Sequence, residues 1–230
     1  MNKTNIANQF FLNDDKRDKL FFGGIALALF FVLLLLAEQV SFWNDEMSQI
    51  AFGLNDIPYL IERSASLEDG VPPLFGIVAW FWYRIVPYGE RWLLLLSIVP
   101  VVVSAYFLGL IGKLTVNART GYIMEILFAA SPFFWYNIAL EFRGYSFLLL
   151  FSVLSIYLYL LRNQGKRKKG ILGLNITLTA LCFSHYFGIM IFGILFLADV
   201  MLLLRKKSNS WICYPMLFRQ SLLSPGSRTC

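Results

Sequence analysis

The stretch LFFGGIALALFFVLLLLA, residues 20–37, contains no charged side chain and decides the fold class of this chain. A helix that spans a bilayer needs roughly 20 apolar residues, with about 17 as a working minimum. The stretch is therefore long enough to cross a membrane. Polar residues 1–19 precede it, and the following sequence LLLLAEQVS offers no small-residue cleavage site, so we expect a retained signal anchor.

Six further apolar runs follow this first one: residues 72–87, 92–111, 121–138, 145–161, 171–184 and 186–204. The composition agrees, because 58% of the residues are hydrophobic and only 15% are charged, whereas soluble domains are nearer a quarter charged. The net charge of +6 does not indicate a nucleic-acid partner, since the basic residues form short clusters between apolar runs. We predict an all-α, polytopic transmembrane helical bundle.

Clusters of basic residues indicate how many of these runs cross the membrane, because short cytoplasmic loops are enriched in Lys and Arg. Three loops and the N-terminal segment carry such clusters: Lys113 with Arg119; Arg162 with Lys166, Arg167, Lys168 and Lys169; Arg205 with Lys206 and Lys207; and Lys3, Lys16, Arg17 and Lys19. All four share one side only if the run 72–87, which begins with two prolines and contains Arg84, does not cross. The sequence therefore predicts about six spanning helices and one interfacial or re-entrant helix on the outer side.

This topology divides the chain into a cytoplasmic tail (residues 1–19), a membrane module (20–204) and a second tail (205–230). Within the module, residues 38–91 form one long outer loop. The link ALEFRG, residues 139–144, and the turn at Ser184, His185 and Tyr186 lie on the same outer side. The tail after residue 204 is polar and short, and its sequence is typical of the end of a fragment or of an altered reading frame.

Two adjacent carboxylates, Asp45 and Glu46, stand in the outer loop within SFWNDEMSQI, residues 41–50. One interpretation is a helix cap, in which Asn44 or Asp45 begins a short amphipathic helix. The other is a general base that takes a proton from an acceptor hydroxyl. A hydrophobic cleft can raise the pKa of a carboxylate for that task, or a neighbouring cation can keep it ionised. Local sequence leaves both interpretations open.

The link after the run 121–138 carries a second polar group, formed by Glu141, Arg143 and Tyr145. Glu141 and Tyr145 are four residues apart and would share one face of a regular helix. An interfacial ion pair would explain these residues. Alternatively, Arg143 binds a phosphate, because its planar guanidinium donates two parallel hydrogen bonds, and Glu141 orients a partner or a metal ion. Because both polar groups face the same outer side, we predict that Asp45 or Glu46 lies within about 10 Å of Glu141 or Arg143 and that they line one outward cavity.

Other polar residues give weaker signals. His185 is the only histidine, and a single His without a neighbouring Cys or second His is not a metal-site pattern. Glu125 and Asp199 lie in apolar runs near the cytoplasmic ends, so we expect their side chains to reach the interface.

The order of these segments resembles the GT-C membrane glycosyltransferases. A first helix is followed by FWNDE (42–46), PPL (72–74), a basic inner loop, SPFFWYN (131–137) and ALEFRGYSF (139–147). More narrowly, residues 20–204 are similar to family 39, the group of protein O-mannosyltransferases and lipid A aminoarabinose transferases, of which this chain would be an N-terminal fragment.

The resemblance implies an inverting transfer of a hexose or pentose from a polyprenyl-phosphate carrier to a glycan, lipid or protein acceptor. It implies Asp45, with Glu46 beside it, as the catalytic carboxylate, and Arg143, Glu141, Tyr145 and Arg84 around the donor phosphate. His185 and Tyr186 would border the cavity. It implies a bacterial plasma membrane, an outer active site and no required cofactor, although a divalent metal ion is compatible with the acidic pair. The competing interpretations are a truncated, inactive transferase, a transporter or a membrane scaffold.

Overall fold

The computed structural model describes residues 3–66, 72–87, 89–163 and 167–208, and within these ranges every regular element is helical, as predicted. The elements are α1 (Lys3–Leu36), α2 (Asn44–Leu54), α3 (Ile57–Ser66), α4 (Pro73–Ile85), α5 (Glu90–Thr115), α6 (Ala118–Ala129), α7 (Pro132–Phe134), the π-helix η1 (Trp135–Ala139), α8 (Tyr145–Asn163), α9 (Arg167–Ser184) and α10 (Phe187–Ser208). Contacts divide the chain into two units, Met1–Gly193 and Ile194–Cys230, and the arrangement below is that of the first. The predicted properties of the tail fall mainly on residues 209–230, outside the described ranges.

Four of the described helices are long and apolar enough to cross a membrane. They are Asp15–Leu36 within α1, Glu90–Thr115, Tyr145–Asn163 and Phe187–Leu204. They indicate a multi-pass integral membrane protein. The sequence led us to expect about six spanning helices, and the difference comes from two runs. The apolar part of α9, Ile171–Ser184, is shorter than a spanning helix, and the run 121–138 is not a single helix.

The run 121–138 is broken because Pro132 cannot continue α6. Proline lacks the backbone N–H and forces the residue before it into an extended conformation. Ser131 accordingly has φ −86° and ψ 112°. The chain resumes in α7 and η1, and the Trp135 indole donates a hydrogen bond across the break to the Ala129 carbonyl at 2.8 Å. The apolar run thus packs as shorter pieces.

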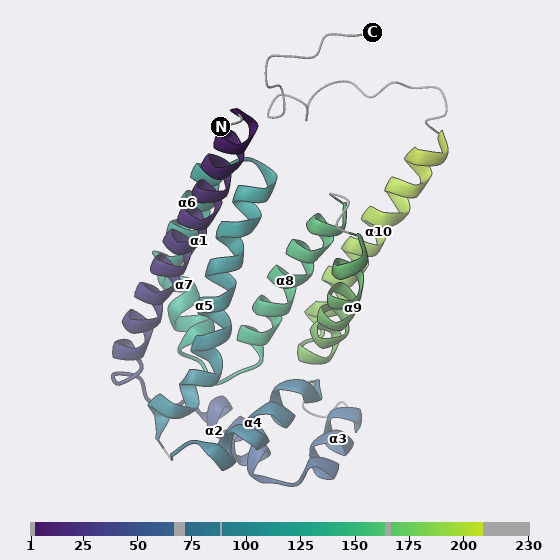
Figure 1. Ribbon diagram of the computed structural model, residues 1–230. Helices are drawn as coiled ribbons and strands as arrows, with labels where there is room; N and C mark the ends of the chain where they lie inside the picture. The colour runs from purple at the N-terminus through teal and green to yellow at the C-terminus, as the bar shows by residue number, and fades with distance from the viewer. Residues whose placement is uncertain (1–2, 67–71, 88, 164–166, 209–230) are drawn as a thin grey trace. The chain divides into compact units, whose positions relative to one another are not determined.

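Close backbone contact holds α6 against α5. Gly121 faces Gly109 and Gly112, and a Cβ at Gly121 would lie only 2.4 Å from the Gly109 carbonyl oxygen. Farther along the same segment, the rings of Phe128 and Phe134 pack 4.4 Å apart between their centroids. The pieces of residues 118–139 therefore follow α5 toward the opposite end of the bundle (Figure 1).

The two ends of the bundle carry different polar contacts. At one end, the Lys113 ammonium lies 2.8 Å from Asp15 and 2.9 Å from Asp18, so the part of α1 that precedes its apolar stretch and the last turn of α5 share that end. At the other end, Arg91 pairs with Glu38. Helices α2, α3 and α4 gather there (Figure 1). For the Lys113 loop and the N-terminal segment, this arrangement agrees with the predicted segregation of the basic clusters from residues 38–91.

Helix α4 is too short to span the bilayer, since its 13 residues rise only about 20 Å. It begins at Pro73, where proline is well suited to a first helical turn. Its buried side chains are Phe75, Ala79 and Tyr83, and the Phe75 ring packs 5.1 Å from that of Phe142 in the 139–144 link. Helix α4 thus packs against the 139–144 link.

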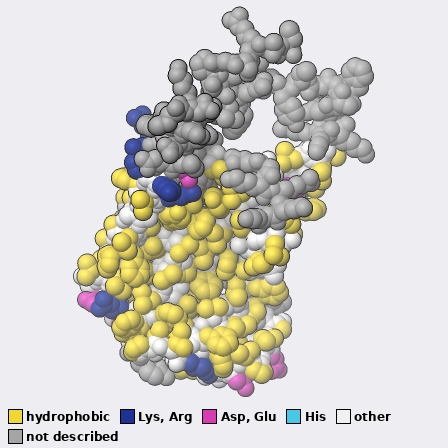
Figure 2. All heavy atoms as spheres, viewed as in Figure 1, with side chains coloured by type: hydrophobic (Ala, Val, Ile, Leu, Met, Phe, Trp, Pro, Cys, Tyr) yellow, Lys and Arg dark blue, Asp and Glu magenta, His cyan; other side chains and the backbone are white. Residues whose placement is uncertain are grey.

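The flank between the two ends is apolar. Figure 2 shows hydrophobic side chains along α1, α5 and α8, with charged side chains toward the ends of the bundle. On α1 these outward residues include Leu27 and Leu35, each more than half exposed. A surface of this kind suits contact with lipid rather than water.

Candidate functional site

Glu46 joins the start of α2 to the 139–144 link. Helix α2 begins at Asn44, and Glu46 reaches back so that its Oε2 accepts a hydrogen bond from the Trp43 backbone N–H at 2.9 Å. This is one half of a capping box. Its Oε1 accepts a second hydrogen bond, at 2.5 Å, from the backbone N–H of Phe142, 96 residues away. The predicted helix beginning at Asn44 is confirmed, but the capping hydrogen bond comes from Glu46 rather than from Asn44 or Asp45. The same carboxylate holds two distant segments together.

Asp45 and Arg143 form an ion pair at the same place. An Arg143 guanidinium nitrogen lies 3.2 Å from Asp45 Oδ2, and the two side chains are 34% and 71% exposed. The sequence predicted that the two polar groups would lie within about 10 Å of each other. This contact confirms the predicted proximity. The sequence also predicted that these groups line one cavity, but the pocket described below is lined by Glu141 and Arg143 and not by Asp45 or Glu46.

The link itself is not helical, which differs from the expectation that Glu141 and Tyr145 share a helix face. Helix α8 begins only at Tyr145, so Glu141 and Arg143 precede it. Between them Phe142 is fully buried, with its ring near those of Phe42, Phe75 and Tyr83. Burial of Phe142 leaves its two polar neighbours to line a pocket.

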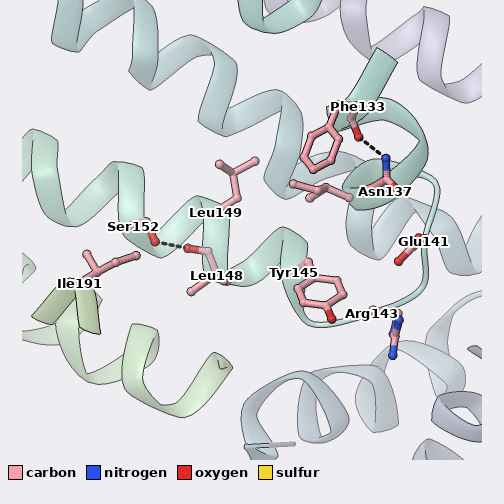
Figure 3. A pocket seen from close by; sticks show the side chains of 10 residues that line it. Phe133, Asn137, Glu141, Arg143, Tyr145, Leu148, Leu149, Ser152 and Ile191 are labelled. Atoms are coloured by element: carbon pink, nitrogen blue, oxygen red, sulfur yellow. Dashed lines mark hydrogen bonds between the residues drawn. The ribbon is translucent and has the colours of Figure 1, made fainter. Parts of the chain in front are cut away.

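This pocket has a volume of about 600 Å³. Its lining residues come from α7, η1, the link, α8 and the start of α10: Phe133, Asn137, Ile138, Glu141, Arg143, Tyr145, Leu148, Leu149, Ser152 and Ile191. Figure 3 shows Glu141, Arg143 and Tyr145 at one end and Ile191 toward the other. The pocket is therefore polar at the link and mostly apolar along α8.

The α8 contribution follows helical spacing, because Tyr145, Leu148, Leu149 and Ser152 stand at positions i, i+3, i+4 and i+7. The sequence contained this stripe, but the same spacing is also typical of ordinary core packing. Asn137 and Ile191 were missed as well, since only the π-helix and the turn before α10 bring them to the pocket.

Near the polar end of the pocket, the pKa values of Glu141 and His185 are shifted from their ordinary values. Burial raises the pKa of Glu141, and the nearby Glu46 and Asp45 carboxylates raise it further, whereas Arg143 opposes this shift. Burial also lowers the pKa of His185, and the positive charge of Arg143 adds to that effect. The site therefore combines the Arg143 cation with one carboxyl group, that of Glu141, whose pKa is raised.

His185 lies beside the pocket without lining it. Its ring centroid is 5.1 Å from that of Tyr145, and its Nδ1 accepts a hydrogen bond from the Phe187 backbone N–H at 3.3 Å. Tyr186 is exposed. The turn after α9 thus reaches the site through a histidine already engaged in local contacts.

Arg84 is not brought to the pocket. Its guanidinium donates a hydrogen bond to the Trp80 carbonyl at 2.6 Å and lies 3.4 Å from the centroid of the Trp80 ring, both on α4. The lining of the pocket gives no support to the prediction that Arg84 meets a donor phosphate there.

The carboxylates at this site do not fit a divalent metal ion. Both oxygens of Glu46 accept backbone hydrogen bonds, and Asp45 is paired with Arg143. Within the described residues no three His, Cys, Asp or Glu side chains are grouped as metal ligands.

Comparison of the chain with models of protein families, with curated proteins and with solved structures found no match. The resemblance to the GT-C enzymes therefore rests on the residues and their arrangement alone.

Glu141→Gln should remove the contribution that Glu141 makes to the pH dependence of stability. Because the pKa of Glu141 is raised in the folded state, its contribution is fully present below the carboxyl's ordinary pKa and is lost as pH rises through the folded pKa. Gln has no proton to lose. The melting temperature in detergent, measured from about pH 4 to 8, should therefore fall less, or rise more, with pH for the variant than for the wild-type chain.

The exposed Glu62 on α3 provides the matched control, as Glu62→Gln. An equal pH dependence for Glu141→Gln and the wild-type chain would contradict the assignment of the raised pKa to Glu141.

Proposed function

We propose that this chain is a membrane glycosyltransferase module that moves a sugar from a polyprenyl-phosphate donor to an acceptor at the outer membrane face. The observation that carries the proposal is the pocket of about 600 Å³, whose apolar wall ends at Arg143 paired with Asp45. A polyprenyl-phosphate sugar has the same division, since an apolar chain is joined to an anionic phosphate.

The donor would bind along α8. Its isoprenoid chain would lie against Leu148, Leu149 and Ile191, and its phosphate would meet the guanidinium of Arg143. Arginine suits this contact because its fork of donors matches phosphate oxygens. Arg143 is 34% exposed, so part of its side chain is accessible to a ligand even while Asp45 is paired with it.

Asp45 would act as the general base. Its side chain is 71% exposed, which allows an acceptor to approach from the water layer. The carboxylate takes the proton of the acceptor hydroxyl as that oxygen attacks the anomeric carbon. The bond from the anomeric carbon to the phosphate oxygen breaks, and polyprenyl phosphate leaves with the electron pair. Attack opposite the leaving group inverts the anomeric centre.

Arg143 would stabilise the charge that the phosphate gains as it leaves. A cation already fixed at the position where negative charge develops lowers the barrier without further reorganisation. The ion pair with Asp45 therefore places the base and the charge-stabilising group next to each other before the donor binds.

The same proposal assigns the topology. The pieces of residues 118–139 would cross together, and α9 would cross with its full 18 residues, which include the basic residues before its apolar part. With the four long helices this gives six spans, and α4 lies at the outer interface. The end marked by Lys113 would then be cytoplasmic, as short basic loops favour. In a bacterium this membrane would be the plasma membrane.

A transporter is the second candidate, because the segment 118–139 is broken beside the pocket. Broken helices that line a cavity are a feature of secondary transporters. Phe133, Asn137 and Ile138 in this broken segment line the pocket. Vesicles containing the chain separate the two functions, since a transferase cleaves the donor phosphate–sugar bond and a transporter moves its substrate intact.

Leu149→Trp should weaken binding of undecaprenyl phosphate, because the larger side chain fills the apolar part of the pocket. Excluding even two methylene groups of the isoprenoid chain would cost about 1.6 kcal/mol, or more than about tenfold in affinity. Binding can be measured by native mass spectrometry of the detergent-solubilised chain.

The matched control is Leu172→Trp, on an exposed face of α9 away from the lining residues. If both variants bind undecaprenyl phosphate as the wild-type chain does, this pocket is not the donor site.

A further inference from the structure

The carboxylate of Glu46 is almost completely buried, with 2% of the residue exposed. Both of its oxygens are used, since Oε2 accepts from Trp43 N–H and Oε1 from Phe142 N–H. Glu46 is absent from the pocket lining. Its environment thus differs from that of its neighbour Asp45, although the two stand side by side in sequence.

The two segments joined by Glu46 are those that carry the ion pair. Asp45 directly precedes Glu46, and Arg143 directly follows Phe142, whose N–H is bound. The rings of Phe42 and Phe142 lie 6.2 Å apart and pack the same two segments together. A displacement of the link from α2 would therefore separate Asp45 from Arg143.

We propose that Glu46 is a positioning residue whose carboxylate ties the first turn of α2 to the 139–144 link and thereby holds Asp45 against Arg143. This role replaces the catalytic role that the sequence suggested for Glu46. The tether itself is independent of any activity, whereas its consequence for catalysis rests on the proposed function.

Asp45 could not be held in this way by its own ion pair. Exposed ion pairs contribute little, because water and salt screen them and both side chains lose freedom. A buried carboxylate that accepts two backbone N–H bonds is a stronger constraint, since removing it leaves buried donors without an acceptor. Arg143 and Asp45 thus meet mainly because Glu46 has already joined their backbones.

Hydrogen exchange tests the tether directly. In the detergent-solubilised chain, peptides that cover residues 139–147 report on the Phe142 amide. Glu46→Ala should accelerate exchange at this amide by about tenfold or more, because the bond to a charged acceptor is lost. Glu46→Gln keeps one acceptor oxygen and should give a smaller acceleration. The control Glu62→Ala, on exposed α3, should leave this amide unchanged.

Sugar transfer from a panel of polyprenyl-phosphate hexoses and pentoses tests the catalytic consequence. Glu46→Gln should retain more activity than Glu46→Ala. In the Glu46→Ala background, Asp45→Asn should reduce the transfer rate by a clearly smaller factor than it does in the wild-type chain. The reason is that the effects of mutations in groups that act together are not additive. If Glu46 only stabilised the fold, Asp45→Asn would reduce the transfer rate by the same factor in both backgrounds.

The exchange measurement tests the tether, and the transfer measurement tests the proposed function. Unchanged exchange at Phe142 in folded Glu46→Ala would overturn the tether, as would a Glu46→Gln chain that loses all transfer while Phe142 stays protected. If Glu46→Ala does not fold, Glu46→Gln provides the same exchange and transfer readouts. If the wild-type chain transfers no sugar, the proposed function fails, and the exchange measurement still decides the tether.

Discussion

Asp45→Asn should reduce sugar transfer by roughly 10²- to 10⁴-fold, the usual contribution of a general base. Asn has nearly the same shape and can still accept a hydrogen bond from Arg143, so the loss would come from the missing proton acceptor. The measurement is the rate of transfer from the polyprenyl-phosphate panel, together with thermal unfolding to show that the variant is folded.

The control for this variant is Asp56→Asn. Asp56 is exposed in the same outer loop, where its Oδ1 accepts a hydrogen bond from the Tyr59 backbone N–H at 3.0 Å. Asn is an equally good residue at such a cap, so little should change. Transfer that survives in Asp45→Asn would remove Asp45 as the base, and Glu141→Gln would then be the variant to compare, because Glu141 lines the pocket.

Arg143→Ala should lower kcat/KM for the donor by roughly 10²- to 10³-fold, as expected when a group that stabilises developing negative charge is removed. The free energy of unfolding should change by only about 1 kcal/mol or less, since the partner Asp45 is largely exposed. Arg143→Lys should recover little of the activity, because a lysine cannot form two parallel bonds to a phosphate.

Arg84→Ala is the matched control for Arg143, since both are arginines at the same end of the bundle and only Arg143 lines the pocket. We expect near wild-type transfer from Arg84→Ala. If instead Arg84→Ala abolished donor binding and Arg143→Ala did not, the phosphate site would lie on α4, as one part of the sequence interpretation allowed.

Much of this fold could be predicted from local chemistry. The apolar runs required helices, because a segment in lipid must satisfy its own backbone hydrogen bonds. The basic clusters grouped the loops, and from that grouping the sequence predicted that Asp45 would meet the 139–144 link. The contact between Asp45 and Arg143 is consistent with this reasoning.

Other features could not be predicted because they depend on packing between distant segments. Glu125 was expected to reach the interface, but it is fully buried, and neither carboxylate oxygen has a hydrogen-bond partner among the described residues. One of these oxygens lies 2.9 Å from where a Cβ on Gly109 would stand. The absence of a side chain at Gly109, in another helix, creates this environment.

The sequence by itself determined that the chain is a helical membrane protein, since hydropathy is a property of short segments. The positions of the basic clusters likewise placed Asp45, Glu46 and the 139–144 link at one end. Only the tertiary structure decided that the two carboxylates differ. Asp45 faces water and Arg143, whereas Glu46 is buried on two backbone amides. The physical reason is the position of Phe142, whose ring packs near that of Phe42, just before α2, and whose N–H donates to Glu46, 96 residues earlier in the chain.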